Sequence, residues 1–204
     1  MYKIIEIYLL TFIPIFVAVD SIGNVPLFLG LVEGTTKKQK HRIILDSVTT
    51  ATAVAVIFMF AGKLVLRFIG ITIADFQIAG GTLLFALALR LLLPFSGGKT
   101  LYGDASRDKM VGVFPMGTPL ITGPAVLTTT LMMLDTYGVI PTFTALVINM
   151  FIVWLSLVKA EGIMKFLGEG GTRAFAKIMY ILLAAIGVMM VRKGVSSVVT
   201  GFLS

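Results

Sequence analysis

The sequence predicts an all-α membrane protein of six transmembrane helices, arranged as two inverted three-helix repeats in which helices 1 and 4 are discontinuous. Three observations predict this fold: a composition suited to lipid, six apolar stretches of spanning length, and helix-breaking motifs that recur 100 residues apart. We expect a single transmembrane domain over residues 1–204, with the first repeat at about 1–95 and the second at about 110–204.

The composition is that of a chain surrounded by lipid. Of the 204 residues, 57% are apolar and 13% are charged, and the mean hydropathy is +1.01. An average soluble domain is roughly 45–50% apolar and about 25% charged. The polar residues are too few to cover a soluble globule of this size, which excludes a disordered chain, a nucleic-acid-binding domain and an ordinary soluble enzyme. There is no cysteine and one histidine, His41, so we expect no metal centre and no cofactor.

A membrane-spanning helix needs roughly 20 apolar residues. Six stretches meet this requirement, at about residues 5–32, 43–66, 71–94, 110–134, 139–160 and 176–200. Longer linkers are expected at 33–42, 95–109 and 161–174, and tight turns near 70 and 135–138. The first stretch is not a cleaved signal peptide in our interpretation, because Glu6 interrupts its basic end and apolar residues resume after Pro26.

The basic residues are distributed unevenly between the two ends of the predicted helices. Seventeen basic and ten acidic residues give a net charge of +7, and twelve of the basic residues fall at the end that carries the three longer linkers. The positive-inside rule then places these linkers in the cytoplasm and both termini outside the cell membrane. The same rule explains the basic run at 37–42, in which we expect His41 to be a solvated loop residue. A lipid-headgroup site is the weaker alternative for this run.

Two of the apolar stretches contain clusters of glycine, proline and short polar residues. The first is Asp-Ser-Ile-Gly-Asn-Val-Pro at 20–26, and the second is Gly-Thr-Pro-Leu-Ile-Thr-Gly-Pro at 117–124. Proline removes a helical N–H group, so both helices should be broken here. Backbone groups freed inside a bilayer persist only where protein or a watery cavity receives them. The alternative is a pair of proline kinks with no ligand.

The two breaks predict a binding site for a zwitterion near the middle of the membrane. The N-terminus of a helix that restarts after a break favours a carboxylate, and the carbonyl groups freed before it favour a cation. Asp20 is the foremost candidate, because a carboxylate within a span is costly and is usually functional. Its structural alternative is a buried N-cap of the restarted helix, formed together with Ser21 and Asn24.

Other polar residues lie outside the breaks. Asp46, Thr49 and Asn149 are candidate ion-coupling residues in addition to Asp20, which could carry a proton or help to hold Na⁺, although threonines in spans often bond only to their own helix. Asp75 is expected to cap the start of the third span. The Ala-Gly-Gly run at 79–81 is expected to permit close helix packing.

Three motifs resemble those of the MarC family of membrane proteins: residues 20–26, Ala-Gly-Gly-Thr-Leu-Leu-Phe at 79–85 and Pro-Leu-Ile-Thr-Gly-Pro at 119–124. The chain is most similar to the archaeal SnatA-type members, which are small neutral amino acid transporters, although Ser21 stands where the family usually has proline. The resemblance implies that substrate binds between the two discontinuous helices. Pro26 is the candidate helix-breaking residue of the first of them. Carried over by position, it gives ten substrate-binding candidates: Asp20, Ser21, Gly23, Asn24, Gly117, Thr118, Pro119, Thr122, Gly123 and Pro124.

The expected function is secondary active transport of glycine, alanine and similar amino acids, driven by an H⁺ or Na⁺ gradient. The expected partners are the amino acid substrate and the lipid bilayer, with a homo-oligomer left open and no nucleic acid. Export of amino acids or of small amphipathic drugs is the alternative, as is a channel. An enzyme is not expected, because the sequence offers no paired acid and base, no metal-ligand cluster and no nucleophile with a partner.

Overall fold

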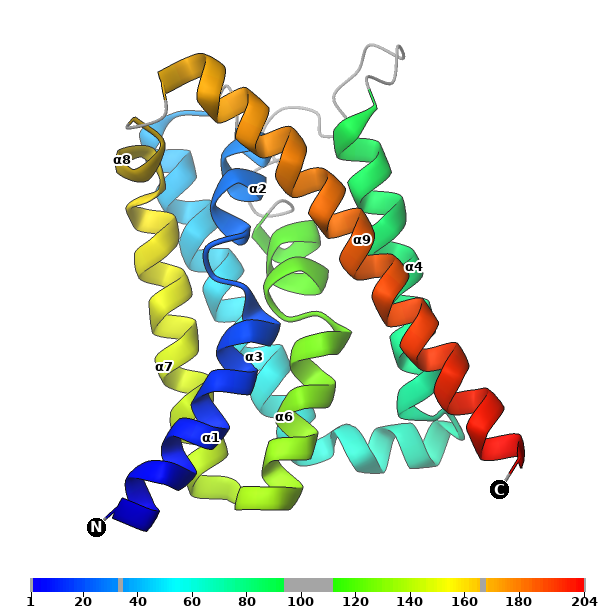
Figure 1. Ribbon diagram of the computed structural model, residues 1–204. Coiled ribbons are helices and arrows are strands. Elements are labelled where there is room, and N and C mark those ends of the chain that lie inside the picture. The colour runs from blue at the N-terminus through cyan, green and yellow to red at the C-terminus, as the bar shows by residue number, and fades with distance from the viewer. Residues whose placement is uncertain (1, 33–34, 94–111, 166–167, 204) are drawn as a thin grey trace.

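The computed structural model of the chain describes residues 2–32, 35–93, 112–165 and 168–203. These residues form helices joined by short turns and contain no strand, which confirms the all-α prediction (Figure 1). In chain order the elements are α1 (Tyr2–Val19), α2 (Asn24–Leu31), α3 (Lys37–Ile69), α4 (Ile73–Leu92), the π-helical segment η2 (Gly112–Ile121), α6 (Pro124–Tyr137), α7 (Val139–Val158), α8 (Ala160–Lys165) and α9 (Gly168–Leu203).

Several of these helices are long and apolar enough to cross a membrane. Four candidate spans meet the length and hydropathy required, and the pair η2 and α6, bent by 52°, adds a fifth when it is counted as one span. The apolar part of α4 covers only Ile73–Leu89, which is shorter than the others. The predicted count of six is therefore not reached on length and composition within the described residues, because the apolar stretch of α4 is too short to count as a span.

Large apolar side chains point outward from several helices. Phe68 is 91% exposed, Ile140 71% and Val17 70%. Soluble proteins seldom expose extended apolar surface of this kind without a partner, whereas lipid solvates it. The outer surface therefore agrees with the composition in indicating a membrane environment.

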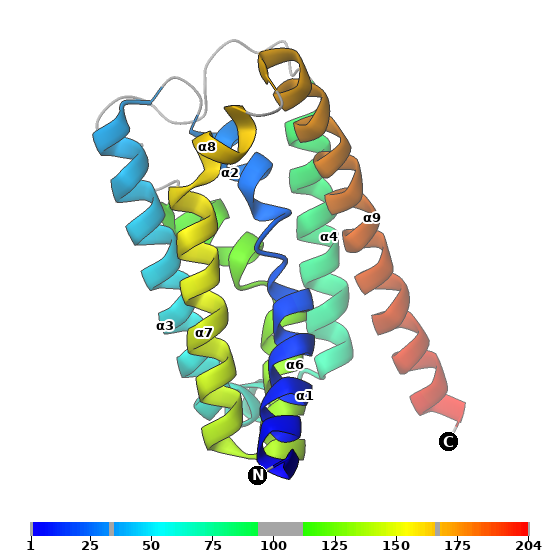
Figure 2. The same ribbon diagram turned by 60° about the vertical axis from the view of Figure 1, so that its left-hand side comes forward.

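Both termini lie at one end of the bundle, and the start of α3 lies at the other end together with α8 (Figures 1 and 2). Figure 2 shows α3 and α7 on one side of the bundle and α4 and α9 on the other, with α1, α2 and α6 between them. The closest packing pairs α4 with α9, α3 with η2, and α1 with α7. The two interrupted segments thus occupy the middle of the bundle.

A capping box at Thr36 sets the start of α3. The Thr36 hydroxyl accepts a hydrogen bond from the Gln39 N–H, and the Gln39 side chain accepts one from the Thr36 N–H at 2.8 Å. The basic run at 37–42, predicted as a linker, therefore forms the first turns of α3. His41 is exposed but helical, so its prediction as a loop residue is wrong. The predicted linker at 161–174 likewise contains α8 and the start of α9.

The turns at the opposite end follow the predictions. Gly70 ends α3 with a φ of 80°, and Gly138 joins α6 to α7 with a φ of 84°, both in the region that favours glycine. Asp75 caps α4 as predicted, because its carboxylate accepts a hydrogen bond from the Thr72 N–H at 2.8 Å. Lys63 of α3 pairs with Asp135 of α6 nearby. At the other end, Lys40 of α3 pairs with Glu161 of α8 at 2.7 Å.

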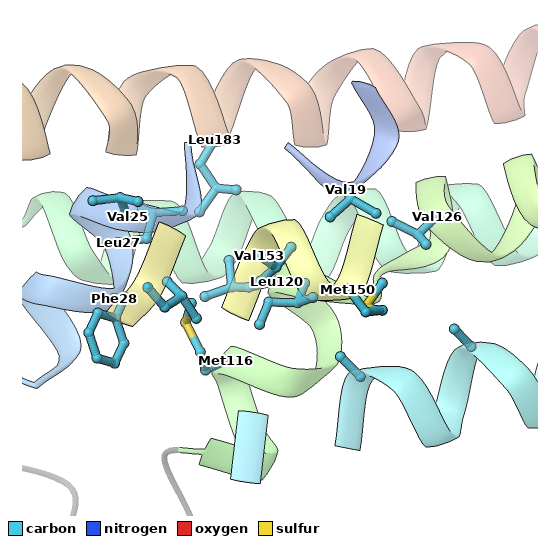
Figure 3. Close-up of a cluster of buried hydrophobic side chains, with 14 of the residues drawn as sticks. Val19, Val25, Leu27, Phe28, Met116, Leu120, Val126, Met150, Val153 and Leu183 are labelled. Atoms are coloured by element: carbon cyan, nitrogen blue, oxygen red, sulfur yellow. The ribbon is translucent and has the colours of Figure 1, made fainter. Parts of the chain in front are cut away.

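The buried core collects side chains from both halves of the chain. Figure 3 shows part of it, with Val25 and Phe28 of α2 near Met116 of η2 and Val153 of α7. Phe28 and Met116 are at most 2% exposed. This shared core connects α2 with η2, α7 and α9, so both interruptions lie against the same set of buried side chains.

Candidate functional site

The first interruption occupies residues 20–23, between the end of α1 and the start of α2. Asp20 has a φ of 47°, a left-handed conformation that Asp tolerates better than most residues. Its carboxylate accepts a hydrogen bond from the Gly23 N–H at 3.1 Å. The helix is therefore interrupted at Asp20 and resumes as α2 within the same span, and the carboxylate caps the start of α2.

Asn24 satisfies the carbonyl groups that the interruption frees. Its side-chain N–H₂ group donates to the Val19 carbonyl at 2.8 Å and to the Asp20 carbonyl at 3.1 Å, and the side chain is 3% exposed. Asn24 therefore caps the end of α1, which differs from the N-cap of α2 considered from the sequence. A side-chain amide suits this position because it can donate to two carbonyl groups at once.

Gly23 is required by the position of the Asp20 carboxylate. A Cβ atom at Gly23 would lie 2.1 Å from Asp20 Oδ2. Ser21 is buried, and its hydroxyl has no hydrogen-bond partner within the described chain. Ser21 thus takes no part in capping α2, contrary to that alternative.

Pro26 is not where the first helix breaks. The helix restarts at Asn24, so Pro26 lies in the first turn of α2. The N–H groups of a first turn have no acceptor within the helix, and proline is tolerated there without the loss of a hydrogen bond. The prediction that Pro26 breaks the helix is therefore wrong by a few residues, and the break belongs to the segment around Asp20.

The second interruption lies between η2 and α6. Within η2, Phe114 and Thr118 have extended backbone conformations, and the Thr118–Pro119 peptide bond is cis. Pro124 occupies the first turn of α6 after Gly123. A Cβ atom at Gly123 would lie 2.4 Å from the Pro119 carbonyl oxygen, so a larger residue would not fit this turn.

Thr122 anchors the second interruption to α3. Its buried hydroxyl donates to the Ala51 carbonyl at 2.9 Å, across 71 residues of sequence. Gly117 packs against the same helix, since a Cβ atom there would lie 3.0 Å from Thr50 Cβ. These contacts hold the unwound backbone in protein and not in lipid, as buried polar groups require.

The two interruptions line one small cavity. Asp20, Gly23 and Asn24 line it from the first interruption, and Pro119, Leu120 and Gly123 from the second. The remaining lining residues are apolar and come from α1, α2, α4, α6 and α9: Ala18, Val19, Leu27, Leu84, Ala125, Val126, Leu183 and Ile186. In Figure 3, Val19 and Val126 point toward one another, and Leu183 extends from α9. The volume is about 50 Å³.

The cavity combines one acidic residue with the N-terminus of one helix, α6. Among the residues described as lining it, Asp20 is the one with an ionisable side chain. The N–H groups of Gly23, Asn24 and Val25 at the start of α2 already donate to Asp20 and Ile22, whereas Gly123 provides no side-chain cap for α6. N–H groups at the start of such a helix attract negative charge. The site therefore offers an anionic group and amide donors within one enclosure of mainly apolar walls.

The structure gathers some of the predicted site residues and leaves others outside the cavity. Ser21, Gly117, Thr118, Thr122 and Pro124 support the interruptions without lining the cavity. Thr118 Oγ1 is buried and has no partner among the described residues. Pro124 packs on Gly80, whose added Cβ atom would meet it at 1.8 Å.

Of the candidate ion-coupling residues, Asp20 lines the cavity, whereas Asp46, Thr49 and Asn149 do not. Asp46 packs against Gly112 of η2, and its Oδ2 atom is buried with no partner in the part of the chain described. Thr49 is exposed and bonds to the Leu45 carbonyl of its own helix at 2.6 Å. Asn149 is buried and donates to the Ala145 carbonyl at 2.9 Å and the Phe12 carbonyl at 3.4 Å.

Sequence reasoning missed the contribution of α4 and α9 to the cavity. Leu84, Leu183 and Ile186 line it, but apolar residues in an apolar helix give no sign of which face meets a site. The Gly80–Gly81 pair was the available signal, because Gly80 brings α4 against Pro124 at the second interruption.

Comparison with known proteins assigns the chain to a family. Residues 5–199 match the profile described as the MarC family integral membrane protein. The inner membrane protein YhgN of Escherichia coli is 26% identical over 86% of this chain and 89% of its own length. Two membrane proteins of Methanocaldococcus jannaschii are also similar. MJ1677 is 28% identical over 94% of this chain and 97% of its own length. MJ0972 is 31% identical over 94% of this chain and 88% of its own length. No solved structure gives a significant match.

Proposed function

The chain belongs to the MarC family of integral membrane proteins, and we propose that it is a secondary active transporter of small neutral amino acids such as glycine and alanine. The observation that carries this proposal is the cavity that both interruptions line, with Asp20 among its lining residues. An amino acid at neutral pH has a positive ammonium group and a negative carboxylate, and the cavity has a complement for each.

The ammonium group would lie at the first interruption. The Asp20 carboxylate supplies a negative charge there, and charge-assisted hydrogen bonds to a carboxylate are stronger than neutral ones. The substrate carboxylate would lie at the start of α6. Ala125 and Val126 line the cavity in the first turn of that helix, where backbone N–H groups have no acceptor within the helix.

The size of the cavity favours small substrates. The cavity volume is about 50 Å³. One water molecule needs about 10–15 Å³ of such volume, so the cavity accommodates roughly four water-sized groups. Glycine and alanine approach this size, whereas leucine and phenylalanine exceed it. Pro119, Leu120 and Leu183 form walls that leave little space for a longer side chain.

The proposed transport mechanism is alternating access between two inverted halves, each with three spans. The helix pairs support this arrangement, since α1 packs on α7 while α3 packs on η2, so the broken helix of each half meets the second span of the other half. Rocking of one half against the other would expose the cavity to each side in turn. The excess of basic residues supports cytoplasmic linkers and extracytoplasmic termini in the cell membrane.

Transport would be coupled to an H⁺ or Na⁺ gradient, with Asp20 carrying the proton or helping to hold the sodium ion. Uptake of labelled glycine into proteoliposomes tests the proposal, with an H⁺ gradient, a Na⁺ gradient or neither imposed. We expect one gradient to drive accumulation and Asp20→Asn to reduce it at least about tenfold, which corresponds to the loss of one charge-assisted contact.

Glu6→Gln is the matched control for that experiment, because Glu6 is an exposed carboxylate of α1, the helix that precedes Asp20, and does not line the cavity. It should transport like the wild type. Uptake by the wild type equal to that of empty liposomes under both gradients would overturn the proposal.

A further inference from the structure

A second cavity lies at the end of the bundle opposite to the two termini. It has a volume of about 150 Å³ and is bounded by α2, α3, α7 and α8. Lys37, Lys40 and His41 of α3 line it, together with Glu161 of α8. The apolar side chains of Phe28, Ile44, Leu157 and Val158 complete the wall. This cavity shares no described lining residue with the cavity between the interruptions.

The basic side chains of this cavity occupy one face of α3. Lys37, Lys40 and His41 are spaced by three and four residues, which places them above one another on a helix. Lys38 and Arg42 belong to the same basic run, are exposed, and do not line the cavity. Three of the basic residues of this run therefore line the same cavity.

The balance of charge in this cavity is positive. Lys40 is paired with Glu161 at 2.7 Å, which holds the Lys40 side chain over the cavity. Lys37 has no ion-pair partner among the described residues. Two lysines and one glutamate leave a net charge of +1 before His41 is counted, so the cavity attracts an anion.

We infer that this cavity binds a phosphate group, carried either by an anionic lipid headgroup or by a free phosphate ion. Basic pockets between transmembrane helices at the cytoplasmic surface are suited to such headgroups. The apolar wall next to the lysines suits the glycerol and upper acyl region of a lipid. By the measure used above, about 150 Å³ accommodates roughly ten water-sized groups, which is ample for a phosphate and its hydration.

Binding at this position would connect the two halves of the chain. Lys37 and Lys40 belong to α3 in the first half, whereas Val158 ends α7 and Glu161 belongs to α8 in the second. A phosphate held by the lysines would sit beside the ion pair that joins the halves at this end. The inference concerns binding alone and does not depend on the proposed transport function.

The test uses the full-length chain in detergent, titrated with dioctanoyl phosphatidylglycerol, with dioctanoylglycerol, which lacks the phosphate, and with inorganic phosphate. We compare the wild type with Lys37→Gln/Lys40→Gln and with the control Lys38→Gln/Arg42→Gln, which removes the same charge outside the cavity. Binding to the phosphate-bearing ligand should weaken about tenfold or more in the first variant, since each basic group contributes separately. It should change by less than about twofold in the control, whose exposed charges are screened.

The ligands distinguish the two sources. Binding of phosphatidylglycerol without inorganic phosphate identifies a lipid headgroup, whereas binding of inorganic phosphate at the same residues identifies a free ion. Equal weakening in both double variants, or in neither, would overturn the inference. If loss of the Lys40–Glu161 pair unfolds the first variant, Lys37→Gln against Lys38→Gln makes the same comparison, because Lys37 takes no part in an ion pair that the structure describes.

Discussion

Gly81 of α4 and Gly187 of α9 pack backbone against backbone. A Cβ atom added to either glycine would lie 2.6 Å from the carbonyl oxygen of the other. This reciprocal contact joins the third helix of the first half to the last helix of the second. It is the close approach that the small residues at 79–81 predict, and it brings Leu84 and Leu183 to the wall of the cavity.

Gly81→Ala should destabilise the protein. The added methyl group forces α4 and α9 apart, and overpacking of this kind costs about 1–3 kcal/mol. Gly162→Ala is the control, because nothing lies within 4 Å of a Cβ atom there and its φ is not left-handed. Thermal unfolding in detergent compares the two variants. Equal stability of both would contradict the close contact between the helices.

Asn24→Ala should also destabilise the protein, for a different reason. The Val19 and Asp20 carbonyls lose the side-chain donor that satisfies them, which costs about 1–3 kcal/mol for buried groups. Thr49→Ala should change the stability by less than about 0.5 kcal/mol, because Thr49 is exposed and bonds only to its own helix. Chemical unfolding of both variants measures the difference, and a neutral Asn24→Ala would show that water satisfies these carbonyls instead.

Thr122→Val should loosen the second interruption while the rest of the fold is retained. It removes the hydrogen bond to the Ala51 carbonyl, which contributes about 1 kcal/mol. Hydrogen exchange of the amides at 117–123 should accelerate. Thr130→Val is the matched control, since Thr130 is equally buried but bonds to Val126 within α6. Accelerated exchange at 117–123 in the control as well would contradict a specific anchor on α3.

The Lys63–Asp135 pair should contribute little to stability. Both side chains are about half exposed, and surface ion pairs contribute about 0–1 kcal/mol because water and salt screen them. A double-mutant cycle with Lys63→Gln and Asp135→Asn measures the coupling energy. A value above about 2 kcal/mol would indicate that this end of the bundle is shielded from solvent more than the structure implies.

The local features of the fold were predictable from the sequence, whereas the tertiary contacts between the helices were not. Glycine and proline clusters break helices through their own backbone properties, so both interruptions could be located to within a few residues. The capping box of Thr36 and Gln39 is equally local, and the basic charges beside it led to the wrong prediction of a linker there. The contribution of α4 and α9 depends on tertiary packing, because Leu84 and Leu183 look like any other residues of an apolar helix. The separation of Asp46 and Asn149 from the cavity depends on packing in the same way.

Binding of labelled glycine to the purified protein tests the central claim most directly, using a variant that fills the cavity between the interruptions. Ala18 lines that cavity, and its neighbour Val17 points outward and is 70% exposed. We expect glycine to bind to the wild type and to Val17→Phe, and alanine but not leucine to displace it. We expect Ala18→Phe to bind no glycine. Undiminished glycine binding in Ala18→Phe, with the same displacement by alanine, would contradict a substrate site between the two broken helices.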